Sequence, residues 1–299
     1  MQTRIRAFIN LIRLPNLLML ALVQILIIVF FLPTFIPAFK FETWKLIILV
    51  GSICLIAAGG NLINAHFDQQ TDLINKSRHY TNYKILGKKN SIFLYVILSL
   101  LGLILGLYLS FIFNNYIAGG IYCFVFIALY LYSKYLKGSF LIGNLLVSTL
   151  IGLSILLPWI ISVQYEVYSI QDSVFQLFLS YSLFATFINF ARELAKDAED
   201  IIGDFSARHT TCPILIGKKR TQQLVQVIVF FCLIGLLGVY FRFFSGQLAP
   251  MLYIFFGLIS TGILVFVKAG NAKRKRNFKN VSTLLKFWMF LGLISFAFY

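Results

Sequence analysis

The sequence predicts an all-α fold, a polytopic membrane helical bundle of about nine transmembrane helices with a candidate active site in its cytoplasmic loops. Hydrophobic residues make up 60% of the 299 residues and charged residues only 12%, whereas a soluble domain carries about 25% charged residues. Long apolar runs follow one another along the whole chain, and no polar or Pro/Ser-rich linker separates them. We therefore expect residues 1–299 to form a single intramembrane domain.

Nine apolar runs approach the roughly 20 residues that a helix needs to cross a bilayer. The third run contains Gly102 and Gly106, whose spacing lets a neighbouring helix approach closely. The fourth run is short. The predicted spans are residues 15–36, 46–65, 91–113, 116–133, 141–163, 173–191, 222–244, 250–268 and 282–298.

The distribution of basic residues predicts the orientation. With the N-terminus inside, 23 of the 26 Lys and Arg residues fall on the cytoplasmic side, when Lys286 in the ninth span is counted with the loop before it, as the positive-inside rule requires. Nine spans then place the C-terminus outside. We expect a multi-pass protein of a bacterial or archaeal plasma membrane. The net charge of +16 has this topological explanation, and no basic soluble domain is present to bind nucleic acid.

Acidic residues are rare and clustered. Of the ten, Glu42, Glu166 and Asp172 fall in outside loops. The other seven fall in two cytoplasmic segments, which follow the second and sixth spans. They are Asp68, Asp72, Glu193, Asp197, Glu199, Asp200 and Asp204.

Each cluster repeats at helical spacing. Asn64, Asp68 and Asp72 are four residues apart, and the second set is spaced i, i+3, i+7, so each set is expected on one helix face. Carboxylates on one face repel, and Mg²⁺, which takes oxygen ligands and substrate phosphates, offsets that repulsion. No His/Cys set competes for zinc. We expect Asp68, Asp72, Asp200 and Asp204 to hold Mg²⁺ and a diphosphate, and Asn64 and Asp197 to complete the catalytic set.

Basic residues near both clusters are candidates for contacts to phosphate oxygens. A cytoplasmic excess of Lys and Arg is expected in any case, and the acids have the alternative role of a solvated cap paired with these bases. The diphosphate-binding candidates are Lys76, Arg78, Lys134, Lys137, Arg192 and Lys196.

These motifs resemble those of the UbiA superfamily of intramembrane prenyltransferases. The family's N-D-x-x-D-x-x-x-D motif stands here as residues 64–72, with Ala65 in place of one Asp. Its D-x-x-D-x-x-x-D motif is complete at Asp197, Asp200 and Asp204. The resemblance covers nearly the whole chain, including nine spans and an acidic motif after the second and sixth.

Finer details are similar to the digeranylgeranylglyceryl phosphate synthase branch. The stretch from Asp72 to Lys76, the R-E-x-x-K-D-x-E-D-x-x-G-D pattern of residues 192–204, and Thr211-Cys-Pro-Ile resemble that branch. Residues 78–81, Arg-His-Tyr-Thr, depart from its R-P-I-P.

The resemblance implies Mg²⁺-dependent transfer of a prenyl group from its diphosphate to a membrane-lipid acceptor. A lipid phosphate is favoured, with Arg78, Lys134, Lys137 and Arg208 as candidate phosphate partners; an aromatic quinone precursor is the alternative. A non-enzymatic transporter would carry its charges near the bilayer midplane, and a CDP-alcohol phosphotransferase would need a contiguous motif that is absent.

Overall fold

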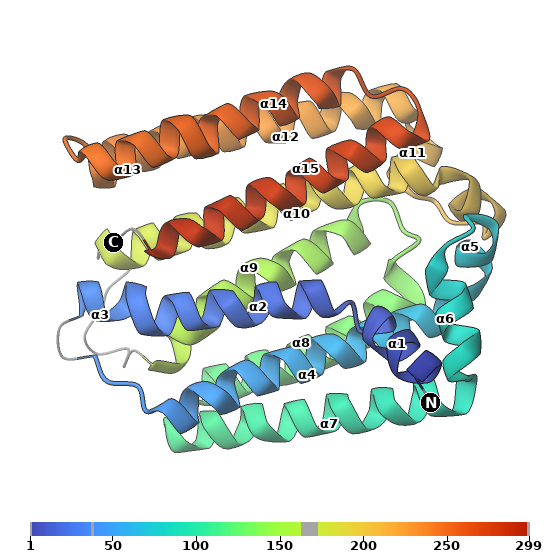
Figure 1. Ribbon diagram of the computed structural model, residues 1–299, viewed down its shortest axis with the longest axis horizontal. Coiled ribbons are helices and arrows are strands. Elements are labelled where there is room, and N and C mark those ends of the chain that lie inside the picture. Colours follow the sequence, from blue (N-terminus) through green and yellow to red (C-terminus); the bar gives the residue numbers. More distant parts are fainter. Residues whose placement is uncertain (1, 37–38, 163–172, 298–299) are drawn as a thin grey trace.

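The computed structural model describes residues 2–36, 39–162 and 173–297, and these form a bundle of helices (Figure 1). Eight helices are long and apolar enough to cross a membrane within the described chain. The prediction of an all-α polytopic bundle of about nine spans is confirmed. The eight spans are Leu14–Phe35 (α2, η1, α3), Thr43–Phe67 (α4), Lys88–Ile112 (α7), Tyr116–Leu136 (α8, η2), Ile142–Ser162 (α9), Ser173–Ser206 (α10), Lys218–Phe244 (α12, η3) and Leu248–Gly270 (α13, η4, α14).

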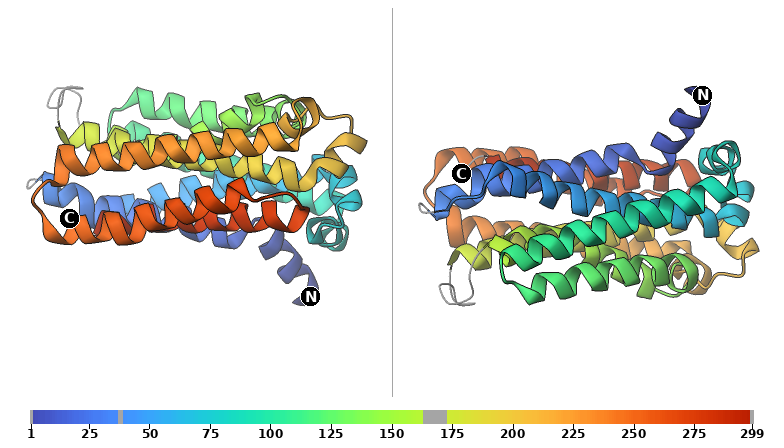
Figure 2. Two further views of the ribbon diagram at one scale, coloured as in Figure 1. Left: turned by 90° about the horizontal axis from the view of Figure 1, so that it is seen from above. Right: turned by 90° about the horizontal axis from the view of Figure 1, so that it is seen from below.

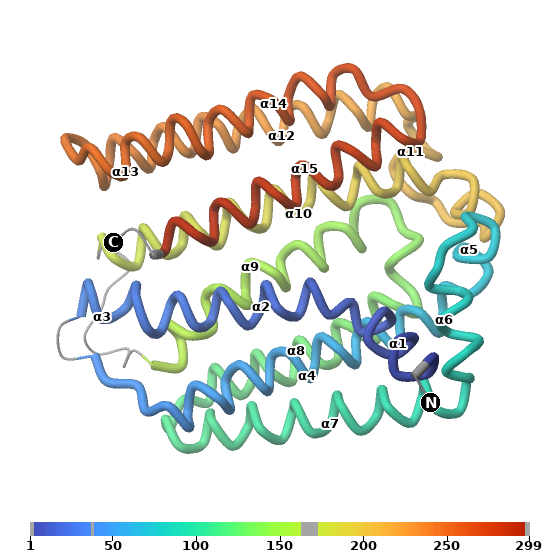
Figure 3. The backbone as a smooth tube through the Cα atoms, in the orientation of Figure 1, coloured from blue at the N-terminus to red at the C-terminus, as the bar shows by residue number. Residues whose placement is uncertain are grey.

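The ninth predicted span corresponds to α15 (Lys275–Ile294), followed by the short η5 (Ser295–Ala297). Helix α15 runs beside α10 (Figure 1). Its first turns are polar and basic, because Lys275, Arg276 and Lys279 precede the apolar part. Helix α1 and the end of α15 lie at opposite ends of the bundle (Figure 3), as an odd number of spans requires.

Four short helices lie at the end of the bundle that carries the acidic motifs. Helix α1 projects away from the bundle in both views of Figure 2. The four are α1 (Gln2–Leu11), α5 (Gln69–Ile74), α6 (Arg78–Leu86) and α11 (Cys212–Leu215).

Small residues bring helices together, as predicted for the third span. A Cβ on Gly102 would lie 2.8 Å from Ile56 Cγ1 of α4, and a Cβ on Gly106 would lie 2.4 Å from the Tyr122 ring of α8. The Tyr122 hydroxyl in turn shares a 2.8 Å hydrogen bond with Ser52 Oγ on α4. These contacts fix α4, which leads directly into the first acidic motif.

Two helix ends differ from the sequence-based boundaries. Helix α10 continues to Ser206 instead of ending at residue 191. Residues 192–206 include Ala, Leu, Glu, Lys and Arg, which favour helix, but their many charges keep them from resembling a span. Helix α4 ends at Phe67. The predicted span ends at residues 163 and 298, and the predicted outside-loop acids Glu166 and Asp172, lie outside the described residues.

Candidate active site

The first acidic motif begins where α4 ends. Asp68 adopts φ −80° and ψ 5°, which breaks the helix between Phe67 and Gln69. Its carboxylate is buried, with 6% of the residue exposed. Asp68 Oδ2 accepts hydrogen bonds from Asn64 Nδ2 at 2.6 Å and from Lys137 Nζ. The buried charge is therefore held by one amide and one ammonium group.

Asp72 lies on α5, beyond this break, so the predicted single helix face from Asn64 to Asp72 is interrupted at Asp68. The spacing is nevertheless nearly kept, because the Asp72 N–H donates to the Asp68 carbonyl at 2.9 Å. Burial raises the pKa of the Asp72 carboxyl, and the nearby charge of Asp68 raises it further, against the opposing charge of Lys137. The two carboxylates thus repel each other in a half-buried place.

Lys137 is the cation that offsets this repulsion. Burial lowers the pKa of its ammonium, but the charge and the hydrogen bond of Asp68 raise it by more, so the pKa stands above its usual value. The segment after η2 (Tyr132–Leu136) that carries Lys137 is held in place by the Thr210 N–H, which donates to the Gly138 carbonyl at 2.7 Å.

The second acidic motif lies on α10 itself, so its prediction as a loop was wrong, while its predicted single helix face is confirmed by an unbroken helix. Asp197 Oδ2 accepts from Asn144 Nδ2 of α9 at 2.6 Å. Asp200 Oδ1 lies 3.8 Å from Lys275 Nζ of α15. Asp204 is buried, and its carboxylate lies 3.5 Å from Thr211 Oγ1 and 3.4 Å from His209 Nδ1.

Asn75 joins the two motifs. Its Nδ2 donates to the Asp200 carbonyl at 3.4 Å, and the Gly203 N–H donates to its Oδ1 at 3.2 Å. Gly203 permits this approach, because a Cβ there would lie 2.3 Å from Asn75 Nδ2. Two segments more than 100 residues apart in sequence therefore meet at one end of the bundle (Figure 1). The sequence included Asn75 in a resemblance but gave no sign of this bridge.

The six predicted diphosphate-binding cations divide into two groups. Arg192 and Lys196 both pair with Glu193, each at 2.9 Å, and Lys137 pairs with Asp68. The other three are exposed and have no carboxylate within ion-pair distance in the described part of the chain. They are Lys76, in the turn after α5, Arg78, the first residue of α6, and Lys134, whose Nζ lies 4.7 Å from the Tyr135 ring.

Arg13 was missed as a site residue. It caps α2 in the left-handed conformation, with φ 55°, and its charge acts on both Asp72 and Lys137. Sequence reasoning counted it only as one of the basic residues before the first span. Nothing local distinguishes Arg13, because its place beside the motifs depends on the packing of α2 in the bundle.

Magnesium fits the chemistry of these residues. No three His, Cys, Asp or Glu side chains converge on a common metal position among the described residues. Mg²⁺ does not need such a set, because it is commonly held by one or two carboxylates together with substrate phosphates. The donors here are carboxylates, and Asp68 and Asp72 form a like-charged pair that a divalent cation would relieve.

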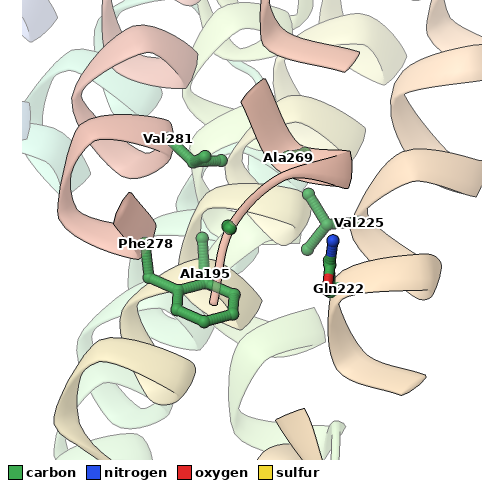
Figure 4. Close-up of a pocket in the computed structure, with 7 residues that line it drawn as sticks. Ala195, Gln222, Val225, Ala269, Phe278 and Val281 are labelled. Carbon is green, nitrogen blue, oxygen red and sulfur yellow. The ribbon is translucent and has the colours of Figure 1, made fainter. Parts of the chain in front are cut away.

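The rest of α10 packs against apolar helices. Figure 4 shows Ala195 facing Val225, Ala269, Phe278 and Val281 around a gap with essentially no room for a water molecule. Farther along the bundle, a largely apolar cavity of about 520 Å³ lies between α10, α12, η4 and α15, with Tyr181, Phe184 and Phe231 in its wall. The carboxylates of α10 thus occupy a polar end of an otherwise apolar helix.

The chain is similar to a known protein family along most of its length. The profile of the UbiA prenyltransferase family matches residues 17–294. The digeranylgeranylglyceryl phosphate synthase of Methanosarcina mazei is 33% identical over 99% of both chains. That of Methanosphaera stadtmanae is 29% identical, over 86% of this chain and 89% of the relative.

Two solved structures share the fold. One, from work on digeranylgeranylglyceryl phosphate synthase in membranes, superposes with a TM-score of 0.69 at 23% identity and covers 100% of this chain and 98% of that one. The other, a UbiA homologue from Archaeoglobus fulgidus bound to GPP and Mg²⁺, gives 0.63 at 12% identity, with 98% and 100% covered.

Proposed function

Because the chain belongs to the UbiA prenyltransferase family, we propose that this membrane prenyltransferase transfers a prenyl group from a prenyl diphosphate to a lipid phosphate, with Mg²⁺, in one intramembrane domain of residues 1–299. The observation that carries the proposal is the junction of the two acidic motifs through Asn75. It brings six polar side chains of two distant segments to one end of the bundle. They are Asn64, Asp68, Asp72, Asp197, Asp200 and Asp204.

The residues of the site have distinct roles in this mechanism. Bound Mg²⁺ would neutralise the charge that develops on the departing diphosphate, and Asp68, Asp72, Asp200 and Asp204 would hold it. Asn64 and Asn144 orient the Asp68 and Asp197 carboxylates through hydrogen bonds of 2.6 Å. Lys137 lies beside Asp68, where its ammonium can donate to a phosphate oxygen.

The reaction balances as a substitution at the first carbon of the prenyl chain. The bond from this carbon to the diphosphate oxygen breaks, and its electron pair leaves with the diphosphate. The acceptor hydroxyl oxygen forms the new ether bond, and its proton leaves with the released diphosphate. The other proposed phosphate-binding cations, Lys76, Arg78, Lys134, Arg192 and Lys196, lie in segments at this end of the bundle.

A lipid phosphate acceptor is supported by relatives along the whole chain. Digeranylgeranylglyceryl phosphate synthases resemble this chain along its length, with 33% identity in one case. Residues 78–81 of this chain still depart from the branch pattern, so an aromatic quinone precursor is the second candidate. The family assignment argues against the transporter alternative.

Single Asp→Asn substitutions test the site, because they keep the shape of the side chain and remove its charge. We expect D68N, D72N, D200N and D204N each to lower Mg²⁺-dependent turnover of radiolabelled geranylgeranyl diphosphate by at least about a hundredfold, since several kcal/mol of transition-state stabilisation would be lost. E199Q is the matched control on α10. Wild-type turnover in all four variants would refute the site.

Mass spectrometry of the product tests the acceptor. The wild-type enzyme receives a prenylglyceryl phosphate and an aromatic acid in the same reaction, and we expect the ether lipid. A C-prenylated aromatic product without ether lipid would overturn the lipid-phosphate acceptor and leave the prenyl transfer in place.

A further inference from the structure

Arg13, Arg192 and Lys286 come from three different helices, and of the three only Arg192 has a carboxylate within ion-pair distance among the described residues. Arg13 caps α2, Arg192 lies on α10, and Lys286 lies on α15. Lys286 Nζ donates to Asn16 Oδ1 of α2 at 2.6 Å, which ties α15 to the start of α2. Helix α15 packs against both α10 and α2, and the charges of Arg192 and Arg13 act on Lys286, so the three cations belong to one positively charged region.

The position of Lys286 makes its charge notable. It is the twelfth residue of α15, roughly 16 Å along the helix from its basic end at 1.5 Å per residue. An ionisable side chain at such a depth in a membrane bundle is costly and points to a functional role. Its hydrogen-bond partner is the neutral Asn16 amide. Within the described residues, no carboxylate lies within ion-pair distance of Lys286 or Arg13.

The available negative charge is already shared. Glu193 is buried and accepts from both Arg192 Nη1, at 2.9 Å, and Lys196 Nζ. Arg192 Nε, also buried, has no hydrogen-bond partner among the described residues. Arg192 and Lys196 therefore share one glutamate, and the buried Arg192 Nε–H remains available to a ligand.

The start of α2 adds to this positive field. Arg13 lies between α1 and α2 in a left-handed backbone conformation, and α2 begins at Leu14. The first turn of a helix carries the positive end of its dipole and favours anions. Asn16 lies in this turn, next to the Lys286 ammonium.

We propose that Arg13, Arg192 and Lys286, with the Asn16 amide, form a second anion site that binds the phosphate monoester of the acceptor lipid. This inference rests on the proposed function. It replaces the acceptor-phosphate partners expected from the sequence, Arg78, Lys134, Lys137 and Arg208, and it assigns Arg192 to the acceptor phosphate instead of the diphosphate. Lys137 is engaged by Asp68, and Lys134 is exposed beside tyrosine rings. The charge of Arg13 also acts to lower the pKa of Asp72, which agrees with an acceptor phosphate near the diphosphate site.

Binding without the first substrate isolates this site. Binding of a prenylglyceryl phosphate is measured in EDTA, with no prenyl diphosphate present, for the wild type and for K286M and R13Q. We expect both variants to weaken binding at least about tenfold, as loss of one charged hydrogen bond implies. K286R, which keeps the charge, retains most of the affinity. K268M, at the exposed end of α14, is the matched control and binds as the wild type does.

Two further ligands identify what the site recognises. The same prenylglycerol without its phosphate is expected to bind the wild type and K286M equally. Inorganic phosphate is expected to compete only weakly, because it lacks the apolar chain. If inorganic phosphate binds as tightly as the lipid, the assignment to a lipid phosphate is wrong.

Kinetics separate this inference from the proposed function. We expect K286M and R13Q to raise KM for the lipid phosphate, and K286M to leave KM for the prenyl diphosphate within about twofold of wild type. An unchanged lipid affinity in both folded variants, or a raised KM for the prenyl diphosphate alone, overturns the second anion site. Failure of the wild-type enzyme itself to prenylate any lipid phosphate overturns the acceptor instead.

Discussion

The substitution G203A tests whether the contact between the two acidic motifs matters. A Cβ at this position would lie 2.3 Å from Asn75 Nδ2 and 2.9 Å from Asn75 Oδ1. Ordinary van der Waals contact begins near 3.4 Å, so the Asn75 amide must withdraw by about 1 Å. It would then lose its hydrogen bonds to the Gly203 N–H and the Asp200 carbonyl.

The cost follows from these contacts. Each lost hydrogen bond is worth about 1 kcal/mol, and overpacking adds about 1–3 kcal/mol. The better helix propensity of alanine returns about 1 kcal/mol. We therefore expect G203A to destabilise the protein by about 2–4 kcal/mol by these magnitudes, and to reduce prenyl transfer because the motifs separate.

Thermal unfolding and initial rates in detergent measure both effects. G238A in α12 is the matched control, because a Cβ at Gly238 meets nothing within 4 Å. In an N75A background the clash is gone, so G203A is expected to be neutral or stabilising there. If G203A alone behaves like G238A in stability and rate, the junction does not hold the site together and our reasoning is wrong.

Three other predictions concern Lys137, His79 and the two chain termini. K137M leaves Asp68 buried without its cation, so we expect the free energy of unfolding to fall by about 1–3 kcal/mol. The loss is smaller than for a fully buried pair because the Lys137 side chain is 31% exposed. We expect little loss in a D68N background, and equal losses in both backgrounds would exclude the coupling. Burial, reinforced by Arg13, lowers the pKa of His79 to about 4 from 6.5. Since the folded pKa is depressed, stability is present above pH 6.5 and lost as pH falls towards 4, and H79Q should lack this loss; parallel pH curves would contradict it. The distribution of basic residues predicts a cytoplasmic N-terminus and an outside C-terminus, and tags at both ends accessible from the same side would refute nine spans.

Much of the architecture followed from the sequence. Hydropathy gave the spans, because crossing a bilayer requires a long apolar run and almost nothing else. It could not find the true end of α10, since residues 192–206 are helical but too polar to look like a span. The helical spacing of Asp197, Asp200 and Asp204 was sufficient to predict a common face, because one regular helix carries them.

The site was less predictable where it depends on contacts between helices. The break at Asp68 was not expected, because the i, i+4 spacing of Asn64, Asp68 and Asp72 is compatible with a straight helix. Lys134 and Lys137 looked equivalent in sequence. In the structure one lies exposed beside Tyr135, and the other contacts Asp68, because a shift of three residues at the end of η2 changes the direction of the side chain.

The sequence by itself determined a membrane bundle with two carboxylate motifs at one face, since composition, charge asymmetry and periodicity are local properties of the chain. Only the tertiary structure decided which side chains share a site. Asn75 reaches Gly203, and Lys286 reaches Asn16 across 270 positions. Such pairings depend on which helices pack together and at what depth, and the many apolar residues on each helix leave that choice open until the whole bundle is formed.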